Sequence, residues 1–175
     1  MGQKEEAFLW NRVNELISPN RQSLFAFGAT EEVIWYYRAN LIDKNTRNDL
    51  IKDIYEKFLE YTDSTNNTNS INEFIKRIRG VKSLIPHNSL ILFNIEKKGS
   101  SIHKALAVNY GNISSSIKNM VWFKSIDDAE KYLDNYLNAN PRRNKNDYII
   151  DHYLTRINQA LEPYSDDYGQ GYQMK

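Results

Sequence analysis

Residues 89–99 read SLILFNIEKKG, and this stretch decides the fold class of the chain. Residues 89–96 form a short and almost continuously apolar run, which is typical of a buried strand. The run ends at Lys97-Lys98-Gly99, a sequence that indicates a hairpin turn. The sequence therefore predicts a buried strand that turns back toward a second one.

Two further strands are expected after this turn. Residues 102–110 have an alternating pattern that favours a strand, although Ala105 and Ala107 are also compatible with a helix. Gly111-Asn112 is a turn signal, and the apolar residues 120–123 indicate a third strand over 118–124. Together these patterns predict a small antiparallel three-stranded meander over residues 89–124.

Upstream of the meander, apolar residues repeat every three to four positions, as they do on one face of a helix. The first expected helix covers residues 4–17, and residues 62–70 have no apolar side chain and predict a mobile loop. Further helices are expected where a Ser or Thr cap is followed by acidic residues, at Thr30, Thr46 and Ser70. The helical N-terminal part is therefore predicted to span residues 1–80.

Two more helices are expected after the meander. Ser125 precedes an acidic first turn and an apolar stripe, and Asp147 is expected to cap a last helix that ends before Pro163. These C-terminal helices are predicted within residues 126–162. Residues 164–175 consist largely of Gly, Ser, Asp, Tyr and Gln and predict a disordered tail.

The order of these elements favours the α+β class, because helices and strands are segregated along the chain rather than alternating. Three strands cannot bury both faces of a sheet alone, so helices must cover at least one face. We expect a helix-rich single domain over residues 1–163, in which the small antiparallel three-stranded meander packs against helices.

The composition limits where the protein acts. The chain has 175 residues and no Cys, so it offers no disulfide and no thiolate metal ligand. No apolar run approaches the roughly 20 residues that span a bilayer, and the N-terminal residues do not resemble a signal peptide. We expect a cytoplasmic protein with no membrane association. Its many Asn, Ile and Lys residues favour a bacterial or phage source.

Positive charge is concentrated in the middle of the chain. The net charge is only +1, yet residues 76–124 contain nine Lys or Arg and a single acid, Glu96. If these cations share one exposed surface, that surface attracts acidic proteins or phosphates. The alternative is that they only solvate a surface balanced by the acidic helices, with the nearby aromatic residues in the core.

Catalytic and metal-binding motifs are absent from the sequence. The three histidines, His87, His103 and His152, do not have the close spacing of metal ligands and are expected on the surface. No nucleophile elbow or phosphate-binding loop occurs. We therefore expect no metal and no cofactor, and an enzyme with a site assembled from distant residues is left as a third interpretation.

The pattern favours a non-enzymatic binding protein that acts by occupying a protein partner with an acidic surface, as immunity and inhibitor proteins do. The alternative is a nucleic-acid-binding module that uses the basic segment 76–124, since bases stack on aromatic rings while cations hold phosphates. Cations would steer the partner and tryptophans would anchor it. The expected binding residues are Arg79, Lys97, Lys98 and Lys104 for steering, and Trp35 and Trp122 as anchors.

Overall fold

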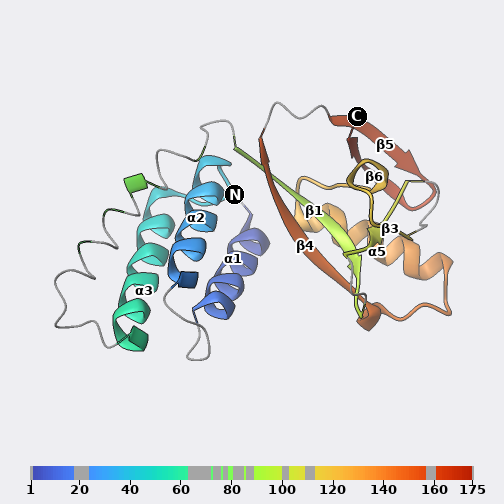
Figure 1. The fold of residues 1–175 in the computed structure, drawn as a ribbon. Helices are drawn as coiled ribbons and strands as arrows, with labels where there is room; N and C mark the ends of the chain where they lie inside the picture. Colours follow the sequence, from blue (N-terminus) through green and yellow to red (C-terminus); the bar gives the residue numbers. More distant parts are fainter. Residues whose placement is uncertain are drawn as a thin grey trace. The chain divides into compact units, whose positions relative to one another are not determined.

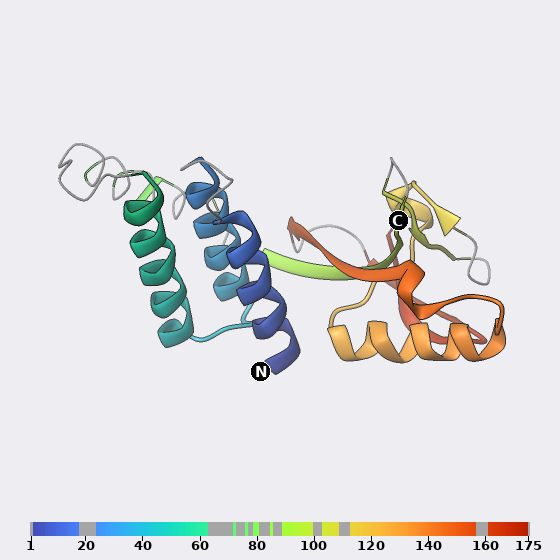
Figure 2. The same cartoon turned by 90° about the horizontal axis from the view of Figure 1, so that it is seen from below.

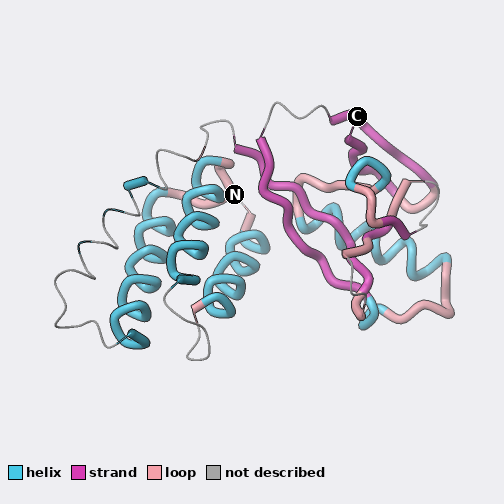
Figure 3. Tube along the Cα trace, viewed as in Figure 1, coloured by secondary structure: helices cyan, strands magenta, loops and turns pink. Residues whose placement is uncertain are grey.

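The computed structural model describes residues 2–17, 24–62, 72, 76, 79–80, 85, 89–99, 103–108, 113–156 and 161–174. The chain forms two compact units, Met1–Leu90 and Ile91–Lys175. The described part of the first is helical, and strands dominate the second (Figure 3). The α+β class is thereby confirmed, whereas a single domain over 1–163 stays a prediction. Among the described residues, no helix is both long and apolar enough to cross a membrane.

Three helices of the helical unit have bounds within the described residues, α1 (Gln3–Leu16), α2 (Leu24–Arg38) and α3 (Lys44–Thr62). Helix α2 lies between the other two and packs against both (Figures 1 and 2). Each helix contributes apolar side chains at helical spacing, and burying them is the main favourable term in folding. The buried residues include Leu9, Val13, Val33, Ile34, Tyr36, Leu50, Ile54 and Phe58.

The first expected helix is confirmed, but two expected helix starts are wrong. Thr30 does not cap α2, because the helix already begins at Leu24 and Thr30 is buried inside it. Thr46 does not cap α3, because its own backbone N–H donates to Asp43 Oδ1 at 2.7 Å. Asp43 therefore caps α3, and the hydrogen bonds from Thr46 hold the pKa of Asp43 below its ordinary value.

Two expectations fall largely on residues that the structure does not describe. Positions 72, 76, 79 and 80 are helical, as predicted for the helix from Ser70, but the other residues of that helix lie outside the described part. Residues 63–70 of the expected loop are also outside it, while Thr62 is the last residue of α3.

The main sheet has four strands, in the order β3-β2-β1-β4, and not the three of the expected meander. The predicted buried strand is confirmed as β1 (Ser89–Lys97), which lies between two neighbours and has Ile91–Ile95 buried on both faces. The second predicted strand is much shorter, as β2 (Ala105–Leu106), and pairs antiparallel with β1. The short β3 (Ile113–Ser114) forms the far edge.

The third predicted strand is not a regular strand. A 3₁₀ turn, η1 (Ile117–Asn119), occupies the start of residues 118–124. Phe123 and Trp122 instead make isolated bridges, the first to Phe93 of β1 and the second to Tyr172. This extended segment therefore joins the sheet to the C-terminal hairpin.

The helix predicted after Ser125 is confirmed as α5 (Ile126–Ala139). Ser125 caps it, and its Oγ accepts from the Asp128 N–H at 3.1 Å.

The last predicted helix and the disordered tail are both wrong. After a short turn, η2 (Lys145–Asp147), the chain forms β4 (Tyr148–Arg156) beside β1 (Figure 1). Aromatic and β-branched residues are frequent in β4, and such residues favour strands. The tail forms a second sheet, the hairpin of β5 (Leu161–Asp166) and β6 (Gly169–Met174).

The hairpin is attached to the rest of its unit by main-chain hydrogen bonds. Trp122 and Tyr172 exchange both N–H···O bonds at 2.8 Å, and α5 packs against β6 and β4. Gly171 lies so close to this contact that a Cβ there would be 2.8 Å from the Trp122 carbonyl oxygen. Only glycine permits such a close approach of two backbones.

Candidate functional site

Three of the expected steering cations lie together at one end of β1. Glu96 pairs with Ala105 in the antiparallel register, so Lys97 faces Lys104, and the Lys97 N–H donates to the Lys104 carbonyl at 2.8 Å. Directly opposed residues of an antiparallel pair project from the same face. Lys98 follows in the turn and is exposed, as is Lys104, while Lys97 is half-buried. We call Lys97, Lys98 and Lys104 the lysine cluster.

The lysine cluster forms no ion pair within the described residues, although Asp147 lies nearby and its carbonyl accepts from the Lys98 N–H. Across the described residues, the ion pairs join other partners, and none involves an ammonium group of this cluster. Like charges that face each other across a strand pair are mildly destabilising, so the arrangement carries a cost without an obvious structural benefit.

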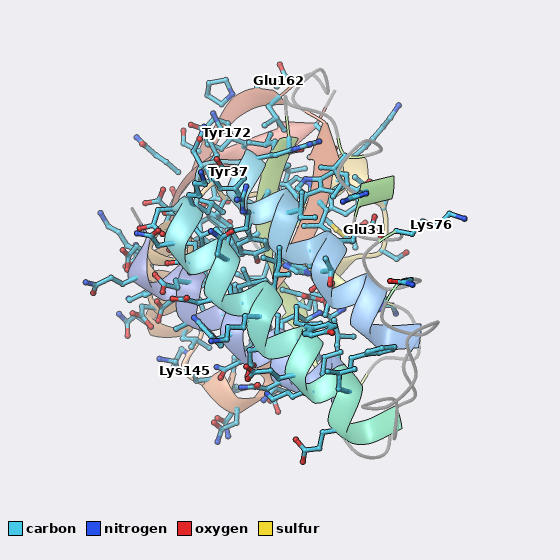
Figure 4. The ribbon with its side chains drawn as sticks, turned by 90° about the vertical axis from the view of Figure 1, so that its left-hand side faces the viewer. Glu31, Tyr37, Lys76, Lys145, Glu162 and Tyr172 are labelled. Atoms are coloured by element: carbon cyan, nitrogen blue, oxygen red, sulfur yellow. The ribbon has the colours of Figure 1, made fainter. Side chains whose placement is uncertain are left out.

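The other predicted cations do not extend this cluster. Arg79 is exposed but belongs to the helical unit, as does Lys76, whose side chain projects away from the ribbon (Figure 4). Lys118 is exposed in η1, and the Lys124 ammonium lies 4.4 Å from the centre of the Tyr172 ring. The basic segment of the sequence is therefore not a single basic surface within the strand unit.

Neither of the two predicted anchors is a fully exposed side chain. Trp122 is only 2% exposed, its indole N–H donates to the Ile117 carbonyl at 3.1 Å, and its ring packs on Tyr153. It is a core residue, so its assignment as an anchor is wrong. Trp35 in α2 is half-buried, and its indole nitrogen is buried without a hydrogen-bond partner among the described residues.

A second group of side chains meets on the sheet, and we call it the carboxylate–histidine cluster: Glu96, His103 and Asp151. Glu96 belongs to β1, His103 precedes β2, and Asp151 belongs to β4, which flanks β1 on the other side. One ligand atom from each residue lies within 4.8 Å of the other two. His103 Nδ1 is 3.2 Å from Glu96 Oε2, and these donor types are those that divalent cations use.

The two carboxyl groups of this cluster affect each other. Burial raises the pKa of Glu96 above its ordinary value, and the negative charge of Asp151 raises it further, while His103 acts in the opposite direction. The Glu96 side chain is 14% exposed, whereas the His103 side chain is 84% exposed. The cluster is thus open to solvent on the histidine side and closed on the glutamate side.

A third feature is a cavity of about 590 Å³ between α5 and the C-terminal hairpin, lined by aromatic rings that include Tyr132, Tyr164 and Tyr168. Two of its tyrosine hydroxyls already take part in hydrogen bonds within the fold. Asp166 accepts hydrogen bonds from the Tyr132 hydroxyl at 2.5 Å, the Tyr164 hydroxyl at 2.7 Å and the Tyr168 N–H at 2.8 Å. These hydrogen bonds hold the hairpin in place, while Asp128, Lys131, Ser165 and Gln170 also line the cavity.

Comparisons with known proteins add no relative. No protein-family model, no curated protein and no solved structure matches the chain. The site must therefore be interpreted from its own chemistry.

The carboxylate–histidine cluster is not predicted from the sequence, because the apolar pattern of residues 147–161 also fits a helix. In a helix, Asp151 could not be placed beside β1. The signal that was available is the composition of residues 148–155, which are rich in Tyr, Ile and Thr and therefore favour a strand. If residues 148–155 are assigned as a strand next to β1, Asp151 and Glu96 can lie side by side on one face of the sheet.

Proposed function

We propose that the protein is a non-enzymatic cytoplasmic binding protein that occupies the acidic surface of a partner protein, in the manner of bacterial or phage immunity and inhibitor proteins. The observation that carries this proposal is the lysine cluster, in which Lys97 faces Lys104 across β1 and β2 and Lys98 extends from the turn. Exposed cations that form no ion pair raise the association rate with an anionic surface.

A protein partner is favoured over nucleic acid because the aromatic residues of the basic segment that the structure describes are buried. Phe93 is 0% and Trp122 is 2% exposed, so neither ring offers a face on which a base could stack. Tyr110 lies outside the described residues. Cations without stacking surfaces fit a charged protein surface better than a single strand of nucleic acid.

An enzyme is not favoured by the described residues. Acid–base catalysis works best when a histidine and a carboxylate share a water-excluding pocket. His103 does lie beside Glu96, but its side chain is 84% exposed. The described geometry therefore supports binding rather than catalysis.

The proposal is tested by charge reversal of Lys97 and Lys98, with fluorescently labelled poly-glutamate as an acidic polypeptide probe. We expect Lys97→Glu/Lys98→Glu to weaken binding about tenfold at low salt, since a few surface charge pairs together contribute on the order of 1–2 kcal/mol. The matched control is Lys44→Glu/Lys52→Glu, which changes the net charge equally at two exposed positions of α3.

Fluorescence anisotropy over a range of salt concentrations separates the two partner classes. A single-stranded oligo(dT) probe that binds more tightly than poly-glutamate, with a steep salt dependence that Lys97→Glu/Lys98→Glu reduces, would support the nucleic-acid alternative. Equal losses in the reversal variant and in its control would show that only the net charge matters, and the proposed surface would be rejected.

A further inference from the structure

We propose that Glu96, His103 and Asp151 bind one divalent transition-metal ion, with Zn²⁺ as the best match. The site would join three parts of the sheet, namely β1, the residue that leads into β2, and β4. This inference goes beyond partner binding and does not depend on it. Glu96 and Lys97 are consecutive in β1 and therefore project from opposite faces.

The distances fit a metal ion after a small adjustment. Two atoms bound to one zinc ion at about 2.1 Å are at most about 4.2 Å apart. The three ligand atoms lie within 4.8 Å of one another, and His103 Nδ1 is already 3.2 Å from Glu96 Oε2. Because the His103 side chain is 84% exposed, its ring can turn toward the carboxylates without displacing the core.

The charges of the cluster also favour a cation. Glu96 and Asp151 bring two carboxylates together on neighbouring strands, and no ion pair within the described residues joins either of them to a Lys or Arg. Like charges at this distance repel, and partial burial strengthens the repulsion. A divalent cation bound between them compensates both charges at once.

The donor set selects the kind of metal. Calcium and magnesium are usually held by oxygen ligands alone, whereas an imidazole nitrogen favours zinc and other late first-row ions. One histidine and two carboxylates leave the fourth position of a tetrahedral zinc ion for water.

The test is isothermal titration calorimetry of the full chain with ZnCl₂ at pH 7. We expect one saturable site, weaker binding of Mn²⁺ and the weakest binding of Mg²⁺, in the order expected for a site that contains an imidazole. His103→Ala and Asp151→Asn should each weaken zinc binding by at least about tenfold, since even residues that only support a ligand have effects of this size. Zinc should also raise the melting temperature of the wild type but not of His103→Ala.

The control is His152→Ala, which removes a neighbouring imidazole on the opposite face of β4 and should keep zinc binding. Circular dichroism checks that every variant is folded, and Glu96→Gln, with nearly the same shape, replaces any variant that is not. The proposal is overturned if zinc gives no saturable binding, if His103→Ala binds as well as the wild type, or if binding is lost in His152→Ala or His87→Ala instead. Magnesium binding as tight as that of zinc would overturn the assignment of the metal.

Discussion

The helical unit and the strand unit both bury aliphatic side chains, but among the described residues buried tyrosines are more frequent in the strand unit. Between α1, α2 and α3 the buried residues are mainly Leu, Ile and Val, which attract one another without directional preference. In the strand unit, Tyr132, Tyr136 and Tyr148 are buried, and Tyr132 donates a hydrogen bond to Asp166. The first kind of core needs apolar residues at the right spacing, whereas the second also needs donors and acceptors at defined positions.

The largest effect is expected from a charge placed in the helical core. Ile54 is 0% exposed in α3, so Ile54→Asp buries a carboxylate among aliphatic groups that cannot hydrogen-bond to it. We expect a loss of more than about 4 kcal/mol in the free energy of unfolding, enough to unfold this unit. Circular dichroism at 222 nm measures the loss of helix.

The control for this variant is Lys52→Asp, which places the same residue on the exposed side of α3. It should melt within a few degrees of the wild type, because surface substitutions of this kind usually change stability by less than about 0.5 kcal/mol. A cooperative melting transition of Ile54→Asp near that of the control would show that α3 does not contribute to a close-packed core.

A second pair of variants compares one glycine from each unit. Gly171→Ala places a Cβ 2.8 Å from the Trp122 carbonyl oxygen and from Val121 Cγ1, and the carbonyl is backbone that cannot easily move. We expect a loss of about 2–3 kcal/mol, in the range of overpacked cores. Gly28→Ala in α2 meets no atom within 4 Å and should stabilise the protein by up to about 1 kcal/mol, since alanine favours a helix.

Chemical denaturation measures both free energies in the same experiment. The comparison fails if both glycine variants shift stability in the same direction by similar amounts, because the hairpin would then not depend on its close approach to Trp122. A destabilised Gly28→Ala alone would instead indicate that the exposed side of α2 is in contact with something at that position.

The same contrast explains which parts of the fold could be predicted from the sequence. Helix α1 and the apolar residues of α3, such as Leu50 and Ile54, were predicted because a period of 3.6 is sufficient to identify a helix packed on one side. The helix starts could not be predicted in this way, since several polar residues compete as caps, and at α3 the side chain of Asp43 rather than Thr46 accepts the N–H.

The C-terminal residues could not be predicted in the same way. Ile150, Tyr153 and Leu154 also fit a helical period, and the preference for a strand is decided by the neighbouring β1, a contact far away in sequence. The hairpin of β5 and β6 has few aliphatic residues and looked like a tail, because its stability depends on tyrosine hydroxyls, on Asp166 and on the backbone pairing with Trp122. Two residues of the lysine cluster are consecutive in the sequence, so that candidate site could be predicted. The carboxylate–histidine cluster could not, because Asp151 reaches Glu96 only when β4 lies beside β1.

Alkaline pH should act on the strand unit, with the smallest effect of all close to pH 10. Burial, together with the hydrogen bond to Asp166, raises the pKa of Tyr132 well above its ordinary value, and burial raises the pKa of Tyr148 to about 12. A group whose pKa is higher in the folded state contributes its stability at neutral pH and loses it as the pH rises past the unfolded value of about 10. The free energy of unfolding should therefore be flat to about pH 9 and then fall by up to about 1.4 kcal/mol per pH unit for each tyrosine.

Tyr132→Phe isolates one of these contributions. At pH 7 it should cost about 1 kcal/mol, because Asp166 loses a donor, but between pH 10 and 11.5 its free energy of unfolding should fall less steeply than that of the wild type. Urea denaturation at half-unit pH steps gives both curves, and all other groups that titrate in this range are common to the two proteins. Parallel curves would mean that the Tyr132 hydroxyl is accessible to water in the folded state. They would contradict the view that buried tyrosine hydrogen bonds stabilise the strand unit.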